Sequence, residues 1–413
     1  DNDQSIAEVH GGMYKGFKEL RDTNGKSERN LFKAMGLDYR FVADGNDTEA
    51  LIAVFEEVKD IDHPVVVHIV TQKGKGYKFA EENPDKFHST SSFNIETGVT
   101  KKEKKIDYSK IFGNKLCELA RKNDKIVAIS AAMIDGTGLK EFKKEFPNRI
   151  YDVGIAEQHA LGMAAGMAQK GMIPVVPIYS SFYQRAYDQV IHDICIQNLP
   201  VVMCVDRAGI VGNDGETHQG LFDMAFFSLI PNITIMAPKN FEELEKMLEF
   251  AINLKRPVVI RYPRGGEGSI HFEKCDEIEL GKSELIRHGN DLTIIAIGKM
   301  VERAVQVAEI LEKQKIDAEV INARFLKPLD DKTIESSINK TKNIITIEDG
   351  ILRGGLATSI VELINNLKLD NVNIKTYGYN DKFVQHGNVD ELEKIYGLDA
   401  ESIASNVKIV EKC

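Results

Sequence analysis

The sequence is poor in cysteine, with five among its 413 residues, and no two of them form a CxxC pair. This spacing argues against a disulfide framework and a zinc site, and it predicts reduced thiols in a cytoplasmic protein. Long apolar runs are missing as well, since no stretch approaches the length that crosses a bilayer. The sequence therefore predicts a protein that has no membrane partner.

Excess positive charge is also absent, because 53 lysines and arginines stand against 63 acidic residues and the net charge is −10. This balance argues against nucleic acid as the main partner. It leaves room for an anionic small-molecule substrate, since a few arginines can build a positive pocket in an acidic protein. The hydrophobic content of 43% and charged content of 28% are typical of a globular chain. The length is enough for two or three domains with sizeable cores.

Apolar segments alternate between strand and helix character along the chain. The β-branched run 64–71 predicts a strand buried on both faces, and the polar stretch 100–105 predicts a linker. Further strands are expected at 125–130, 173–178, 200–205, 257–262, 291–297, 318–322 and 343–348. Helices are expected at 51–58, 108–121, 182–197, 301–314 and 354–366, and from Glu157 onward. The pattern predicts an α/β fold with parallel sheets in three domains, 1–105, 106–275 and 276–413, of which the first is incomplete.

Glu157 follows a short apolar strand and stands in the first turn of a helix rich in alanine and glycine. A carboxyl buried there can keep a proton and share it with a ring nitrogen of a ligand. The alternative is an ordinary acid at a helix N-terminus, stabilised by the helix dipole. The residues that follow Glu157 along the chain favour the first interpretation.

Three later segments carry polar groups at predicted strand ends, where ligands of parallel sheets gather. Residues 178–189 offer aromatic side chains for a planar ring, although aromatics at helical spacing are more often core. Residues 206–220 form a glycine-punctuated loop with several ionisable groups, among them Asp214 and His218. Arg207 and Arg264 can bind a phosphate by forked bonds, or they are solvated surface cations.

Four segments, taken in order, resemble those of 1-deoxy-D-xylulose-5-phosphate synthases: 155–160, 179–189, 206–220 and 261–265. The similarity runs along the whole chain and includes 71–77, 87–88 and 324–329. Transketolases share the helix of Glu157 but lack the 206–220 loop in this form. The resemblance implies a parallel-sheet thiamine diphosphate-binding fold. Its parts would be a partial diphosphate-binding (PP) domain, a pyrimidine-binding (Pyr) domain and a transketolase-like C-terminal domain.

The resemblance also implies roles for individual residues. Those that would bind the cofactor are Asn2, Gln4, Lys73, Met133, Glu157 and Phe182. Of these, Asn2 and the carbonyl of Gln4 would hold Mg²⁺ on the diphosphate. Those that would act in catalysis are Glu157, His218, His88, Asp214 and Arg185. The phosphorylated aldehyde would be received by Tyr179, Arg207 and Arg264, with Arg185 beside them.

The reaction implied by the resemblance is a transferase reaction with thiamine diphosphate and Mg²⁺ as cofactors. Pyruvate loses CO₂ and its remaining two carbons join D-glyceraldehyde 3-phosphate, which gives 1-deoxy-D-xylulose 5-phosphate for isoprenoid, thiamine and pyridoxal synthesis. The cofactor supplies the carbon chemistry, and the protein supplies proton transfer and orientation. Family analogy implies a cytoplasmic homodimer that binds only small-molecule substrates.

The sequence departs from the family pattern in several places. It contains no Gly-Asp-Gly metal motif, and it begins at Asp1 without methionine. We therefore expect a preceding segment, and favour a fragment or a partly given chain over one subunit of a split enzyme. The connection from Ile6 to Leu31 is short, Asn46 stands where the family has histidine, and Ala131 replaces a proline. Two alternatives stay open: a related thiamine-dependent transferase with another acceptor, and a non-catalytic binding module.

Overall fold

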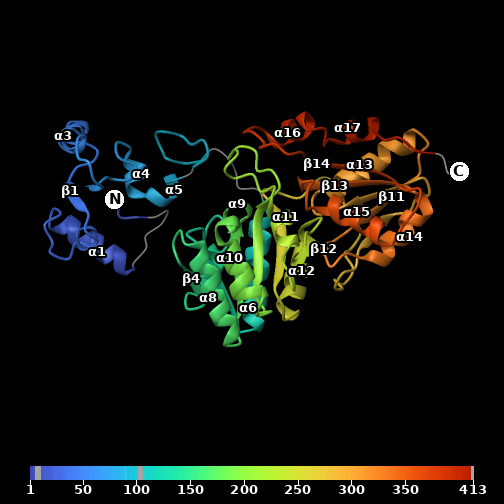
Figure 1. The fold of residues 1–413 in the computed structure, drawn as a ribbon, viewed down its shortest axis with the longest axis horizontal. Coiled ribbons are helices and arrows are strands. Elements are labelled where there is room, and N and C mark those ends of the chain that lie inside the picture. The colour runs from blue at the N-terminus through green and yellow to red at the C-terminus, as the bar shows by residue number, and fades with distance from the viewer. Residues whose placement is uncertain (5–10, 89, 101–105, 411–413) are drawn as a thin grey trace. The chain divides into compact units, whose positions relative to one another are not determined.

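The computed structural model describes residues 1–4, 11–88, 90–100 and 106–410 (Figure 1). It divides into two compact units, Asp1–Lys104 and Lys105–Cys413. No helix within the described ranges is both long and apolar enough to cross a membrane.

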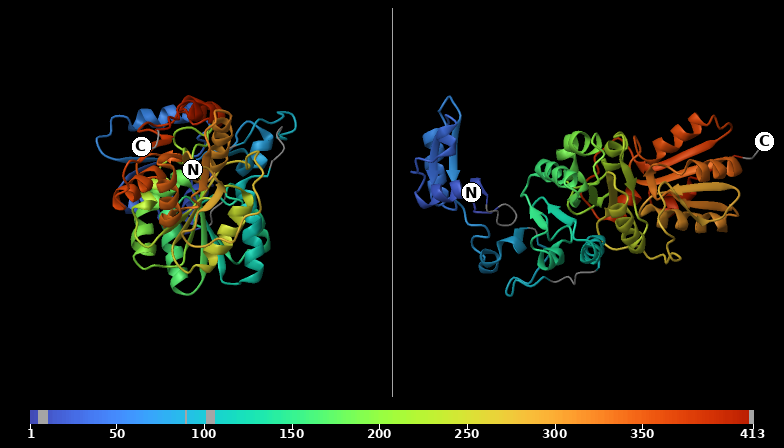
Figure 2. Two further views of the ribbon diagram at one scale, coloured as in Figure 1. Left: turned by 90° about the vertical axis from the view of Figure 1, so that its right-hand side faces the viewer. Right: turned by 90° about the horizontal axis from the view of Figure 1, so that it is seen from below.

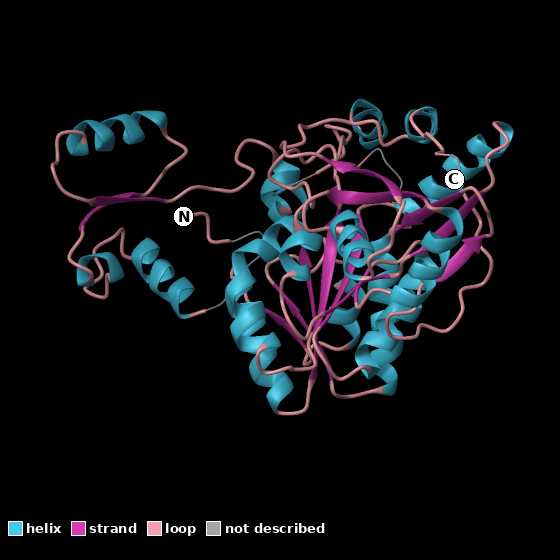
Figure 3. Ribbon diagram, turned by 45° about the vertical axis from the view of Figure 1, so that its right-hand side comes forward, coloured by secondary structure: helices cyan, strands magenta, loops and turns pink. Residues whose placement is uncertain are grey.

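The first unit is built on two parallel strands, β1 (Asp38–Val42) and β2 (Val65–Ile69), paired from Asp38 opposite Val65 (Figure 3). Its helices are α1 (Gly12–Asp22), α2 (Leu31–Ala34), α3 (Thr48–Val58), α4 (Lys78–Glu82) and α5 (Pro84–His88). Side-chain oxygens of Asn30 and Asp47 accept backbone N–H groups at the starts of α2 and α3. These two caps explain where the helices begin.

The expectation of a strand at 64–71 buried on both faces is wrong in its burial. In β2 only His68 is buried, and the other residues are partly exposed. Among the described residues β1 is the only strand hydrogen-bonded to β2, so the sheet lacks the cover that a central parallel strand has. His68 is held between Tyr39, at 2.6 Å from Nδ1, and Asp1, at 2.8 Å from Nε2. Burial lowers the pKa of this imidazole.

The second unit contains a seven-stranded sheet in the order β12-β7-β8-β6-β5-β3-β4, and all its pairs except β12 with β7 are parallel. The strands are β3 (Ile126–Ser130), β4 (Ile150–Asp152), β5 (Ile173–Tyr179), β6 (Val202–Ala208), β7 (Thr234–Met236), β8 (Val258–Pro263) and β12 (Phe325–Lys327). Helices α6 (Tyr108–Lys122), α7 (Lys140–Glu145) and α12 (Phe241–Asn253) pack on one face. Helices α8 (Glu157–Gln169) and α11 (Asp223–Ser228) pack on the other.

A five-stranded sheet follows, in the order β14-β13-β10-β11-β9, with only β9 antiparallel (Figure 2). Its strands are β9 (Glu284–Arg287), β10 (Leu292–Ala296), β11 (Ala318–Asn322), β13 (Asn343–Ile351) and β14 (Asn373–Tyr379). Helices α13 (Met300–Lys313), α16 (Val389–Ile395) and α17 (Ala400–Ser405) cover one face. Helices α14 (Asp331–Thr341) and α15 (Leu356–Asn366) cover the other and share a hydrophobic core with α8 and α11.

The helix predicted at 182–197 is confirmed as a helical segment, but it is irregular and runs from Ser180 to Cys195. The chain there forms α9 (Ser180–Tyr183), a 3₁₀ turn (Gln184–Ala186), α10 (Tyr187–Gln189) and a π-helical turn (Val190–Cys195). Short 3₁₀ and π segments change the direction in which successive side chains point, and they often occur at functional sites. Hydrophobic periodicity does not distinguish these kinds of helix, so the sequence predicts one regular helix there.

Candidate active site

The predicted site residues of the second unit follow neighbouring parallel strands. Strand β4 leads to Glu157, β5 ends at Tyr179, β6 contains Arg207, and β8 leads to Arg264. Because these strands run in the same direction, their carboxyl ends lie along one edge of the sheet. The topology therefore brings four separate sequence segments to one edge.

Glu157 is the first residue of α8 and is only 4% exposed. Helix α8 approaches the sheet closely because its inward face is made of small side chains, such as the fully buried Ala160 and Ala164. Arg185 donates from Nη1 to Oε2 of Glu157 at 3.0 Å and to the carbonyl of Ile155 at 3.1 Å. Arg185 thus contacts the buried acid and the main chain beside it.

The rings of Tyr179, Phe182 and His218 form an aromatic row at the same edge of the sheet. The rings of Tyr179 and Phe182 lie 5.6 Å apart, and those of Phe182 and His218 lie 5.2 Å apart in an edge-on arrangement. Burial raises the pKa of Tyr179 to about 12, so its hydroxyl stays protonated and able to donate near neutral pH. A side chain at Gly136 would come within 2.2 Å of that hydroxyl, which explains the glycine there.

Two guanidinium groups converge on one carboxylate oxygen. Nη1 of Arg207 lies 2.8 Å from Oδ2 of Asp214, and Nη1 of Arg264 lies 2.7 Å from the same oxygen. The guanidinium of Arg207 also stacks on the ring of Tyr179, 3.8 Å from its centroid. Arg207 has a φ of 59°, an unusual conformation for a residue other than glycine, and this backbone turn directs its side chain. Two guanidinium groups this close together can donate hydrogen bonds to one doubly charged anion.

The sequence analysis assigned no role to the carboxyl of Asp206, which precedes Arg207 on β6. Asp206 is fully buried, and its Oδ2 accepts a hydrogen bond from the Ser109 hydroxyl at 2.7 Å. Burial raises the pKa of this carboxyl to about 7. An aspartate at the end of the otherwise apolar run 200–205 is the sequence signal that marks it.

Met133 and His218 occupy loops at the same edge of the sheet. The N–H of Met133 donates to the Ser130 hydroxyl at 3.0 Å, directly after strand β3. Nδ1 of His218 lies 2.9 Å from the hydroxyl of Thr217. This contact leaves Nε2 of the imidazole available for proton transfer.

The remaining predicted site residues belong to the first unit, so their grouping with those of the second unit stays a prediction. Asn2, Gln4 and Lys73 line one pocket of about 270 Å³, together with Arg21. Oδ1 of Asn2 accepts from the N–H of Gln4 at 3.2 Å. His88 is exposed at the end of α5 and is not among the residues that line this pocket.

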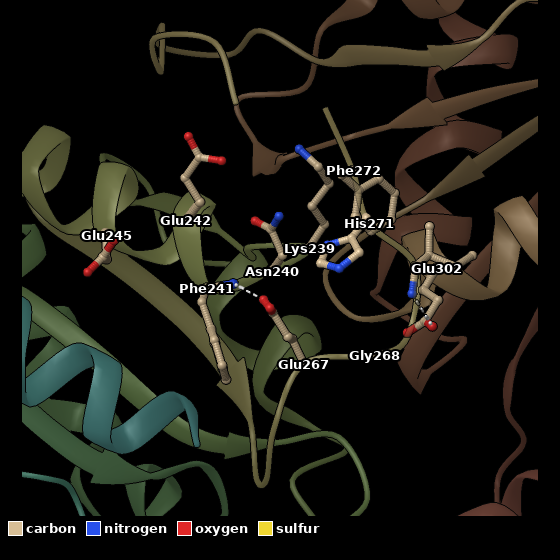
Figure 4. A pocket seen from close by; sticks show the side chains of 11 residues that line it. Lys239, Asn240, Phe241, Glu242, Glu245, Glu267, Gly268, His271, Phe272 and Glu302 are labelled. Carbon is tan, nitrogen blue, oxygen red and sulfur yellow. Dashed lines mark hydrogen bonds between the residues drawn. The ribbon is translucent and has the colours of Figure 1, made fainter. Parts of the chain in front are cut away.

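A second pocket, of about 290 Å³, is lined by none of the predicted site residues (Figure 4). Its walls are rich in acidic side chains, but two of these are engaged with the backbone. Glu267 accepts from the N–H of Phe241 at 2.9 Å, and Glu302 accepts from the N–H of Ser269 at 2.7 Å. These carboxylates fasten the segment that follows β8.

Comparison with known families defines the class of protein first. The transketolase pyrimidine-binding domain matches residues 104–266, and the transketolase C-terminal domain matches residues 281–403. A solved structure titled "Split gene transketolase, inactive beta4 tetramer" superposes with a TM-score of 0.66 at 30% identity, and covers 73% of this chain and 97% of that one. The fold is therefore that of a transketolase-type α/β protein.

More specific matches define the family. The 1-deoxy-D-xylulose-5-phosphate synthase model matches residues 1–71. The synthase of Clostridium tetani is 50% identical over 377 residues, which is 91% of this chain and 61% of the relative. That of Clostridium kluyveri is 46% identical over 413 residues, or 99% of this chain and 66% of the relative. The chain belongs to the 1-deoxy-D-xylulose-5-phosphate synthase family, and it spans about three fifths of the length of the curated relatives it matches.

Proposed function

We propose that the protein condenses pyruvate with D-glyceraldehyde 3-phosphate, with release of CO₂, to form 1-deoxy-D-xylulose 5-phosphate. Thiamine diphosphate would be the cofactor, with Mg²⁺ as its metal. The observation that carries the proposal is the convergence of Arg207 and Arg264 on Asp214, beside the aromatic row and the buried Glu157. This pair of substrates requires a site for the cofactor and a pocket that binds a phosphate group.

The residues of the second unit fit the aminopyrimidine end of the cofactor. Glu157 supplies a buried carboxyl that would hold a proton at a ring nitrogen, and Phe182 supplies a partly buried ring for stacking. When bound, thiamine diphosphate would supply the electron sink for the carbon chemistry. Arg185 would keep the Glu157 carboxyl oriented, because it contacts the acid and the neighbouring carbonyl of Ile155.

For the metal, the first unit supplies part of a ligand set. Asn2 and Gln4 offer amide and carbonyl oxygens, which suit Mg²⁺, and Lys73 lies in the same pocket. Among the described residues no three carboxylate, histidine or cysteine side chains gather into a metal site. The diphosphate and water would therefore provide further oxygens.

Substrate binding would replace the Asp214 carboxylate by the phosphate of the aldehyde at the two arginines. The phosphate of the aldehyde would take the guanidinium groups of Arg207 and Arg264 from Asp214, because a dianion attracts both more strongly than a shared carboxylate oxygen does. His218 would move a proton at Nε2, since Nδ1 contacts Thr217. We propose that His88 assists from the first unit.

The wider organisation is proposed on family grounds. We propose a cytoplasmic homodimer whose chain divides at about residues 105 and 275 into PP, Pyr and C-terminal parts. Buried, unpaired thiols at Cys117, Cys195, Cys204 and Cys275 support a reducing compartment.

Removal of either arginine tests the phosphate pocket. Arg207→Ala or Arg264→Ala should weaken glyceraldehyde 3-phosphate binding about 10- to 100-fold, because a charge-assisted hydrogen bond is lost. Affinity for thiamine diphosphate should not change. Isothermal titration calorimetry with each ligand in the presence of Mg²⁺ measures both affinities. Release of ¹⁴CO₂ from labelled pyruvate measures turnover. Arg121→Ala, which breaks an exposed pair with Glu145, is the matched control. Equal losses for both ligands would contradict the assignment.

A second candidate is a non-catalytic binding module, and one observation favours it. The matched split-gene transketolase, which corresponds to most of the second unit in length, is titled inactive. The same calorimetry separates the two candidates. Micromolar binding of thiamine diphosphate with Mg²⁺ counts against the module, and absence of binding would mean that catalysis depends on residues outside this chain.

A further inference from the structure

The loop that carries Asp214 and His218 is anchored at both ends in the five-stranded sheet domain. Ile210 and Leu221 are only 2% exposed, and both belong to the hydrophobic core formed by α13, β10 and β14. The adjacent Gly209 and Gly220 exchange two backbone hydrogen bonds of 2.7 Å each. Both ends of the loop therefore pack against a domain that contributes none of the predicted site residues.

The side chain of Gln219 makes a second connection to that domain. It is 4% exposed, and its Oε1 accepts from the N–H groups of Val211 at 2.8 Å and Gly212 at 3.4 Å. Its Nε2 donates to the carbonyls of Gln385 at 3.2 Å and Val384 at 3.5 Å. One amide group thus closes the loop on itself and joins it to the segment between β14 and α16.

Backbone contact reinforces the same junction. The N–H of Gly387 lies 3.4 Å from the carbonyl of Gly212. Gly212 has a φ of 71°, and a side chain there would come within 2.6 Å of the Gly387 carbonyl. Only glycine permits both this conformation and this approach.

Asp214 and His218 lie between these two anchor points, Gly212 and Gln219. The Asp214 carboxylate holds the two arginines together, and the His218 ring packs against Phe182. A change in the path of the loop would displace both side chains by a distance that matters for binding and proton transfer.

We propose that Gln219 is a positioning residue, through which the C-terminal domain fixes the loop that carries His218 and Asp214, the partner of the two arginines that would bind the substrate phosphate. The part of this inference that concerns the substrate rests on the proposed function. The part that concerns loop order does not.

The test compares Gln219→Leu and Gln219→Glu with the unmodified chain. The leucine removes all four hydrogen bonds, whereas the glutamate keeps an acceptor for Val211 and Gly212 and loses the donor to Gln385 and Val384. Gln385→Ala is the matched control, because Gln219 contacts only its main-chain carbonyl. Hydrogen exchange at the amides of Val211 and Gly212 should accelerate about tenfold or more in Gln219→Leu, less in Gln219→Glu, and not in the control.

Ligand affinity supplies the second measurement. In both Gln219 variants the Kd for glyceraldehyde 3-phosphate should rise about tenfold while the Kd for thiamine diphosphate stays constant. Unchanged exchange at Val211 and Gly212, or an equal loss of both ligands, overturns the proposal. If the unmodified chain binds no aldehyde phosphate, the proposed function fails, and the exchange rates still decide the positioning role. Should Gln219→Leu not fold, Gly212→Ala disturbs the same junction from the backbone and must show the same faster exchange at Val211.

Discussion

At the scale of single residues, the site depends on charges whose partners come from distant segments. Asp214 shares one oxygen between Arg207 on β6 and Arg264 directly after β8, and Asp206 lies buried one residue before Arg207. Among the described residues, Oδ1 of Asp206 has no hydrogen-bond partner, and Ser109 is the only side chain that donates to Oδ2. A buried carboxyl with so few hydrogen bonds affects the free energy of unfolding, and it also affects the position of Arg207, the next residue.

Asp206 should make stability depend on pH in a defined direction. Burial raises its pKa from 3.8 to about 7, so the folded state binds this proton more tightly than the unfolded state does. The contribution of this group to folding is therefore most favourable below about pH 4 and declines up to about pH 7, by as much as about 1.4 kcal/mol per pH unit.

Asp206→Asn should remove that decline. Urea unfolding of both proteins at intervals between pH 5 and 8 measures it, and the variant should gain relative stability as the pH rises to 7. Ser109→Ala is an informative companion, because loss of its hydrogen bond raises the pKa of folded Asp206 further and extends the decline to higher pH. A constant difference between Asp206→Asn and the parent at all pH values would refute the assignment.

At the scale of elements, helical glycines serve different purposes according to what surrounds them. In α6, a side chain at Gly113 would come within 2.0 Å of the Gly138 carbonyl, so the glycine permits close packing. In α8, Gly166 is exposed and has no atom within 4 Å of the place that a side chain would take. The second glycine therefore only weakens its helix.

The two alanine substitutions should have opposite signs. Gly166→Ala should raise the free energy of unfolding by about 0.5–1 kcal/mol, through the better helix propensity of alanine. Gly113→Ala should lower it by about 1–3 kcal/mol, because backbone atoms must move. Chemical denaturation of each variant measures both. A loss of stability at Gly166 would show that the exposed face of α8 is covered in solution.

How far the sequence predicts these elements depends on the kind of interaction that determines each one. Strand β11 and the start of α8 at Glu157 were predicted correctly, because hydrophobic pattern and small-residue spacing are local signals. The helical character predicted for 182–197 is confirmed, but the 3₁₀ and π turns within it leave no signature in hydrophobic periodicity. The site contacts of Asp214, Asp206 and Gln219 link residues on different strands or domains, and no local pattern reports them.

At the scale of the second unit, buried ion pairs join the two sheets. Arg261 on β8 contacts Asp223 at 2.7 Å and, across the domain junction, Asp349 on β13 at 2.7 Å. All three side chains are almost fully buried. Removal of Arg261 would leave the two carboxylates as uncompensated charges in the interior.

Arg261→Ala should therefore lower the free energy of unfolding by about 3–5 kcal/mol. It should also separate the melting of the two sheets into two calorimetric transitions, because the ion pairs that join them are lost. Arg121→Ala, which breaks the exposed pair with Glu145, should cost less than about 1 kcal/mol and serves as the control. A similar small loss for Arg261→Ala would mean that apolar packing alone joins the sheets.

Strand β12 has a consequence for anyone who wishes to dissect this chain. It lies between β11 and α14 along the sequence, yet it pairs with β7 and inserts Phe325 into the core beside α6 and α12. A truncation after residue 275 would remove β12, which pairs with β7. The edge of β7 would then be exposed and prone to aggregation, and the core would lose Phe325. The smallest piece of the second unit suited to expression therefore extends past the boundary that domain names imply, and has to keep residues 325–327 with everything before them.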